Sequence, residues 1–162
     1  MNQTHLHLLI THLPIFGSIL GGLVLSRGLW TKSNQTIMAA YNLLIISTIG
    51  SGIAYLTGEG AEKTVEDLLG VVEATIKQHE EFAMISFISL IILGLASVLG
   101  LFLTLRNSLF IRTTAFVILF VSLISFGLVA RTGYLGGQIR HTETNSANYP
   151  IPAQHEKESD ND

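Results

Sequence analysis

The sequence predicts an all-α integral membrane protein, a four-helix bundle in up-down-up-down order. Hydrophobic residues make up 48% of the 162 residues and charged residues only 13%, which is too few charges to cover a soluble protein of this size. The apolar residues also fall into four blocks, each long enough to cross a hydrocarbon layer of about 30 Å as a helix. A backbone exposed to lipid must satisfy its own hydrogen bonds, so blocks of this length are predicted to be helices.

The predicted spans cover residues 8–30, 36–57, 82–105 and 109–139, within a transmembrane domain over residues 1–141. The connection between the second and third spans is longer than the others, and its apolar residues recur at helical spacing, which predicts a helix on the outer surface within residues 60–80. From Ala74 onward we favour an outward extension of the third span. Residues 142–162 have little apolar content, so we expect them to form a flexible polar tail.

Charge distribution predicts the orientation. Arg27 and Lys32 lie between the first two spans, Arg106 and Arg112 lie between the last two, and neither loop contains an acidic residue. Loops rich in Lys and Arg stay in the cytoplasm, so the twelve acidic residues and both termini are expected on the non-cytoplasmic side. The first basic residue follows the first apolar block, which predicts a retained span and not a cleaved signal. We expect a multi-pass protein of a bacterial inner membrane, with both termini in the periplasm.

Small residues recur at spacings that would let helices approach closely. They form the pairs Gly17 and Gly21, Ser47 and Ser51, Gly94 and Ser97, and Gly133 and Gly137. Packing between helices is the ordinary role of such residues in membrane bundles. The alternative is that the glycines leave room for a flat cofactor between the helices.

Histidine is the most informative residue type for function. In the predicted topology His5, His7 and His12 precede or enter the first span, His79 lies at the head of the third, and His141 at the end of the fourth. These histidines therefore gather at the outer membrane face. Histidine can serve there as an interfacial residue or as a hydrogen-bonding group between helices. Ionisable groups at membrane depth are costly and tend to be functional, so ligation of a metal is the competing interpretation.

Spacing narrows the candidate ligands. His7 and His12 are five residues apart, which places them about 140° apart around a helix, so they are not expected to share one metal. We expect His12 and His79 as the first ligand pair and His7 with His141 as a second. Arg131, Tyr134, Gln138 and His141 share one helix face. This stripe could hold a haem propionate through Arg131, or line an outer aqueous notch.

The absence of cysteine limits the possible cofactors. A chain without cysteine has no C-x-x-C-H haem attachment and no thiolate-bound iron–sulfur cluster. Any redox centre must then be held by imidazoles. One or two b-type haems with bis-histidine ligation meet this requirement, and a histidine-rich copper or zinc site is the alternative.

Two motifs stand out, His7 followed by His12-Leu13-Pro14, and Gly133-Tyr134-Leu135-Gly136-Gly137 in the last span. Together they resemble a family of small four-span bacterial membrane proteins of unknown function. Leu8 and Leu13 stand where that family has proline and phenylalanine. The resemblance implies functional roles for His7, His12 and His79, and for His141 at the end of the motif. Some members are fused to Rieske-type domains, so the resemblance also implies a redox role.

These observations predict a membrane-anchored b-type haem protein that relays electrons near the outer face, as an electron-transfer subunit more than a stand-alone enzyme. Its expected partners are the lipid bilayer, other membrane or periplasmic redox proteins and a quinone, with no nucleic acid because no strongly basic face is present. Assembly into a larger complex or a homo-oligomer is compatible with this role. The alternatives are a structural or assembly subunit without a cofactor and, third, metal-ion binding or transport.

Overall fold

The computed structural model describes residues 3–66 and 73–147, with the side chains of residues 6–58, 74 and 76–138. Its helices are α1 (Gln3–Ile10), α2 (His12–Thr31), α3 (Asn34–Glu66), α4 (Glu73–Leu105) and α5 (Ile111–Ala147). Four segments are long and apolar enough to cross a membrane, namely Leu6–Thr31, Asn34–Gly58, Ile76–Leu105 and Ile111–Gln138. The predicted all-α bundle of a multi-pass membrane protein is therefore confirmed.

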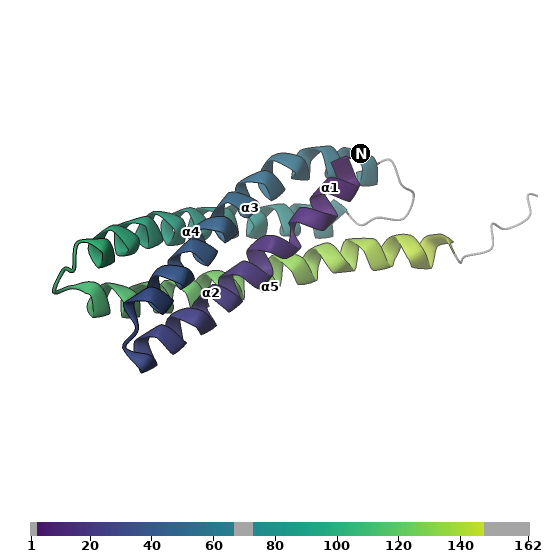
Figure 1. Cartoon of the computed structure of the whole chain (residues 1–162). Coiled ribbons are helices and arrows are strands. Elements are labelled where there is room, and N and C mark those ends of the chain that lie inside the picture. The colour runs from purple at the N-terminus through teal and green to yellow at the C-terminus, as the bar shows by residue number, and fades with distance from the viewer. Residues whose placement is uncertain (1–2, 67–72, 148–162) are drawn as a thin grey trace, which may run out of the picture.

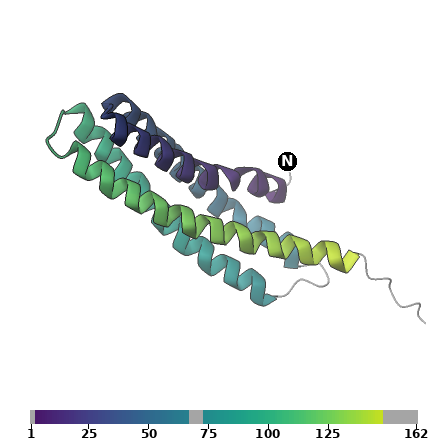
Figure 2. The same ribbon diagram turned by 90° about the horizontal axis from the view of Figure 1, so that it is seen from below.

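The helices form a ring in which α2 and α4 each pack against both α3 and α5. Figure 1 shows the α2–α3 and α4–α5 connections at the same end of the bundle, which we call the turn end. The opposite end, which carries His7 and His79, is the histidine end. There α1 packs mainly on α3, and its ribbon diverges from α5 in both Figure 1 and Figure 2.

Both connections at the turn end are built in the same way. Lys32 and Asn107 adopt left-handed backbone conformations, with φ of 56° and 51°. The residue that follows each, Ser33 or Ser108, donates its N–H to a carbonyl in the last turn of the preceding helix, at 3.0 Å in both cases. The hydroxyl of each serine then accepts a backbone N–H at the start of the next helix. These contacts satisfy backbone groups that helix ends leave unpaired, so the chain reverses within a few residues.

Glycine and hydroxyl side chains hold the helices together. A Cβ atom on Gly94 would lie 2.6 Å from Oγ1 of Thr48, and this hydroxyl donates to the carbonyl of Leu90 at 2.8 Å. Ser47 likewise donates across to the carbonyl of Pro14, beside Gly17. The packing interpretation of the small residues therefore applies to Gly17, Gly94 and Ser47, because the neighbouring helix fills the space at these positions.

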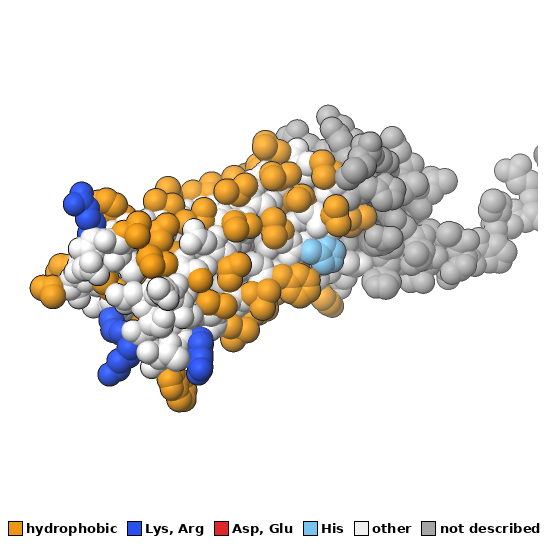
Figure 3. All heavy atoms as spheres, viewed as in Figure 1, with side chains coloured by type: hydrophobic (Ala, Val, Ile, Leu, Met, Phe, Trp, Pro, Cys, Tyr) orange, Lys and Arg blue, Asp and Glu red, His pale blue; other side chains and the backbone are white. Residues whose placement is uncertain are grey.

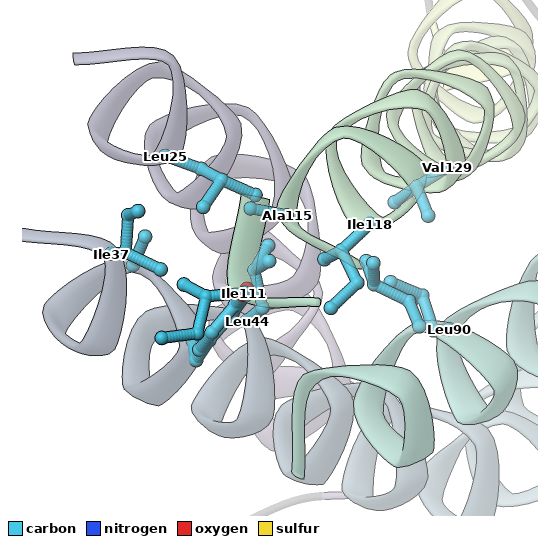
Figure 4. Close-up of a cluster of buried hydrophobic side chains, with 11 residues drawn as sticks. Leu25, Ile37, Leu44, Leu90, Ile111, Ala115, Ile118 and Val129 are labelled. Carbon is cyan, nitrogen blue, oxygen red and sulfur yellow. The ribbon is translucent and has the colours of Figure 1, made fainter. Parts of the chain in front are cut away.

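The apolar core lies toward the turn end and spans all four long helices (Figure 4). Fully buried members include Leu25 of α2, Leu44 of α3, Leu93 of α4 and Ala115 of α5. The flanks of the bundle carry large exposed apolar side chains, such as Phe120 at 66% exposure. Figure 3 shows these hydrophobic side chains along the flank and Lys and Arg side chains gathered at the turn end, as a membrane-spanning bundle requires.

The first span contains a one-residue break in its helical hydrogen bonding at Thr11, which itself keeps helical dihedral angles (φ −61°, ψ −24°). α1 ends at Ile10 and α2 begins at His12. Pro14 has no N–H to donate to the carbonyl of Ile10, and its ring crowds that carbonyl. Proline is tolerated in the first turn of a helix, so a new helix begins just before it.

The connection between the second and third spans also differs from the prediction. Residues 60–66 continue α3, and residues 73–80 open α4, so the described parts of this connection extend the spans themselves. The third span is extended from Ala74 as part of α4, which begins at Glu73. Lengthening an existing helix adds a hydrogen bond per residue, whereas a separate helix must be nucleated. α5 likewise runs on to Ala147, past the predicted domain boundary at 141, and the rest of the predicted tail lies outside the described residues.

We expect Gly94→Ala to destabilise the bundle by about 1–3 kcal/mol, because the new methyl group would collide with Thr48 and displace its hydrogen bond to α4. Gly127→Ala is the matched control, since a Cβ there meets nothing within 4 Å. The unfolding midpoint of each variant in detergent, followed by circular dichroism, measures the difference. Equal midpoints would contradict the tight α3–α4 contact.

Candidate functional site

Two half-buried histidines, His7 and His79, each reach across to a neighbouring helix at the histidine end. Nδ1 of His7 lies 2.9 Å from the carbonyl oxygen of Ala54 and 3.2 Å from Oγ1 of Thr57, both on α3. Nδ1 of His79, on α4, lies 3.0 Å from the carbonyl oxygen of Thr132 on α5. Each imidazole is therefore oriented by a backbone carbonyl of a helix other than its own.

These contacts determine which ring nitrogen carries the proton. A carbonyl oxygen only accepts, so Nδ1 of His7 and Nδ1 of His79 must be the donors, which is an assignment from hydrogen bonding. In the neutral rings Nε2 then keeps its lone pair. Histidines that bind metals are typically arranged in this way, with the second nitrogen donating to a carbonyl or carboxylate. The geometry thus presents two imidazoles in the ligating tautomer.

Both imidazoles lie at the histidine end, His7 against α3 and His79 against α5. Glycines lie beside both rings. A Cβ on Gly136 would stand 3.2 Å from Cε1 of His79, and a Cβ on Gly58 would stand 3.7 Å from Cε1 of His7. A Cβ on Gly137 would meet nothing within 4 Å.

Hydroxyl contacts tie α4 to α5 beneath His79. Oγ of Ser86 lies 2.8 Å from Oγ1 of Thr132, and Oγ of Ser89 lies 2.7 Å from Oγ of Ser125. Thr132 thus binds α4 twice, through its hydroxyl and through the carbonyl that accepts from His79. These contacts limit the movement of His79 relative to α5.

His12, the expected first ligand beside His79, takes a different position. Its side chain is exposed, and its ring stacks on Phe16 with the centroids 6.3 Å apart. Nδ1 of His12 lies 2.8 Å from the carbonyl oxygen of Leu8, which also accepts from Oγ1 of Thr11 at 3.0 Å. Both contacts are local to the helix break, so His12 supports the junction of α1 and α2.

The polar stripe of α5 forms on the expected helix face. Nε2 of Gln138 donates to the hydroxyl of Tyr134 at 3.1 Å, and Cζ of Arg131 lies 5.5 Å from the Tyr134 ring and 5.7 Å from the Phe82 ring. Arg131, Tyr134 and Gln138 are all exposed, whereas Thr132 and Gly136 face His79. The stripe therefore lies on the surface of the bundle, where cationic and aromatic residues suit the membrane interface.

One other predicted site residue, His141, falls at the edge of what the structure describes. The backbone of His141 belongs to α5, but its side chain lies outside the described residues. Within the described residues, no group of three or more His, Asp or Glu side chains is placed to hold a metal ion. His141 as a ligand stays a prediction.

Sequence reasoning did not find the groups that orient the histidines. The carbonyls of Ala54 and Thr132 are backbone groups, and backbone groups carry no residue-type signal. Gly136 was recognised as part of a motif, yet its contact with His79 depends on how α4 and α5 pack. The role of Ser86 could not be predicted either, because serine is common wherever membrane helices pack against each other.

No protein family, curated protein or solved structure matches this chain. The family resemblance suggested by the two motifs therefore stays a prediction, and the geometry at the histidine end is the main guide to function.

Proposed function

We propose that this chain is a membrane-anchored b-type haem protein that relays electrons near the outer membrane face. The observation that carries the proposal is the pair of half-buried imidazoles, His7 and His79, each with Nδ1 bonded to a carbonyl and Nε2 left as a donor atom for iron. Both contacts join an imidazole to a backbone carbonyl, and no Arg or Lys side chain takes part in them. Imidazoles buried among apolar helices are the ligand set of b-type cytochromes.

The types of side chain at the histidine end suit a haem. The chain has no cysteine, so imidazole is the strongest iron ligand available to it. Gly136 keeps the α5 surface against His79 free of a side chain, which lets the imidazole ring lie close to the helix backbone. A haem with two imidazole ligands supplies a one-electron couple and offers no open coordination position, which suits electron transfer better than catalysis.

The residues of this chain would then act by orientation and by exclusion of water. Ala54 and Thr132 orient the two rings through their carbonyls, and the Ser86–Thr132 contact holds α4 in register with α5. The surrounding apolar side chains lower the local dielectric, which tunes the potential of a bound redox centre. Arg131 as a propionate partner and His141 as a ligand stay predictions, and the expected second pair of His7 with His141 is incompatible with His7 as the partner of His79.

The contacts favour His7 as the partner of His79, in place of the pair His12 and His79 expected from spacing. His12 is exposed and bonded to the carbonyl of Leu8 at the α1–α2 junction, whereas His7 and His79 are half-buried and each bonded to a carbonyl of a neighbouring helix. A structural role is the second candidate, because both rings bridge two helices and the same hydrogen bonds could serve packing alone.

The orientation is part of the proposal. We place the turn end in the cytoplasm because Arg27, Lys32, Arg106 and Arg112 gather there.

The chain has no cysteine, so a single introduced cysteine can be labelled selectively. Asn107→Cys, at the turn end, should react with a membrane-impermeant maleimide only in inverted vesicles. Gln78→Cys, near the histidine end, should react in intact spheroplasts. The opposite pattern would put the histidines on the cytoplasmic side.

The spectral test separates the candidates. Dithionite-reduced minus oxidised spectra of the purified chain should show a b-type alpha band that His7→Ala and His79→Ala abolish and that His12→Ala leaves in place. Circular dichroism of the same samples checks that the variants remain helical. A wild-type chain without the band would leave the structural role. Loss in His12→Ala with retention in His7→Ala would reverse our choice of ligands.

Adjacent glycines provide a matched pair for the same site. Gly136→Ala should weaken haem retention about ten-fold, because the new methyl group would push against Cε1 of His79. Gly137→Ala should bind haem like the wild type, since nothing lies within 4 Å of its Cβ position. Haem titration followed by absorbance measures both affinities. Equal effects from the two variants would mean that ring placement by Gly136 is unimportant.

A further inference from the structure

A groove runs between α4 and α5 at the turn end, on the outside of the bundle and away from the histidines. Its volume is about 380 Å³, and its walls include Leu99 and Leu103 of α4, Thr113, Thr114 and Val117 of α5, and Phe110 of the connection. Ile118, which is 1% exposed, forms the floor. The groove is therefore a mostly apolar depression on the outer surface of the bundle, and it begins at the turn end.

The hydroxyls of Thr113 and Thr114 in this groove have no hydrogen-bond partner among the described residues. The hydroxyls of Thr104 and Thr132, by contrast, donate to the carbonyl four residues earlier, as threonines in helices commonly do. Thr113 and Thr114 stand in the first turn of α5, which begins at Ile111. The backbone N–H of Thr114 donates to the carbonyl of Phe110 at 2.9 Å, and the positive end of the helix dipole lies at this point.

Arg106 stands at the same end of the groove. It follows Leu99 and Leu103 at i+7 and i+3, so all three share one face of the helical turns that lead into the connection. Its guanidinium lies 5.4 Å from the Phe102 ring and has no hydrogen bond or ion pair with any described residue. The sequence has no acidic residue between Glu81 and Glu143, nor before Glu59. The positive charge of Arg106 thus has no counter-ion among the described residues, and it lies at one end of an apolar groove.

We propose that this groove binds one acyl chain of an anionic phospholipid, with the lipid phosphate held by Arg106 and the Thr113 hydroxyl at the start of α5. The volume suits a single hydrocarbon chain and is too small to receive a helix, whose diameter with side chains is about 10–12 Å. Basic sites between transmembrane helices at a membrane surface are known to select anionic headgroups. The site is independent of the proposed haem.

Native mass spectrometry can test this directly. The protein is released from nanodiscs that contain equal amounts of phosphatidylglycerol and phosphatidylcholine, and the retained lipids are counted. We expect the wild type to retain one phosphatidylglycerol and Arg106→Gln to lower that retention about five-fold, the effect expected of one basic side chain at an anionic surface. Thr113→Val should act in the same direction. Arg27→Gln is the matched control, because Arg27 is an exposed arginine of the turn end on α2.

A second variant tests the acyl-chain part of the site. Val117→Trp should fill the groove and reduce retention while the helix content stays that of the wild type. Equal retention of the two lipids by the wild type would overturn the proposal. Equal losses of lipid in Arg27→Gln and Arg106→Gln would also overturn it. So would a Val117→Trp variant that retains as much phosphatidylglycerol as the wild type. If no lipid is retained and Val117→Trp separates a dimer, the groove is an interface between copies of this chain.

Discussion

The structure depends on the requirement that polar groups inside a membrane bundle find partners within the protein. Helices satisfy the backbone, but they gain little from burying apolar surface against each other, because lipid is equally apolar. Association must come from close packing and from hydroxyl contacts. The contacts of Thr48 with Leu90 and of Ser122 with Ser18 are of this kind. Glycine beside them lets the backbones approach closely enough for these bonds to form.

This requirement is met differently at the two ends. Toward the turn end the buried side chains are mostly apolar, the buried hydroxyls of Ser97 and Thr104 donate to carbonyls of their own helix, and each connection closes with a left-handed residue and a serine. At the histidine end Ile76 and Leu135 are buried, and the imidazoles of His7 and His79 bond to carbonyls of other helices. Rigid support from packed helices is what a ligand site needs to hold its geometry.

The helix break before Pro14 links the packing to the site. α1 packs mainly on α3, and His7 reaches Ala54 and Thr57 on that helix. The break at Thr11 leaves a carbonyl at Leu8 that accepts from Thr11 and His12. Helical spacing already directs His7 and His12 to different sides of the first span, and the break supplies a local partner for His12.

The sequence by itself determined the membrane class, the four spans and the clustering of histidines at one end. These follow from the length of the apolar blocks and the positions of charged and ionisable residues, which are local properties of the chain. The face of α5 that carries Arg131, Tyr134 and Gln138 was also predictable, because helical spacing places them together. Only the tertiary structure decided that this face lies on the surface of the bundle, that His7 bonds to α3 and that His79 bonds to α5. Those facts depend on helix rotation, on the bend at Pro14 and on backbone carbonyls of other helices, none of which a one-dimensional pattern records.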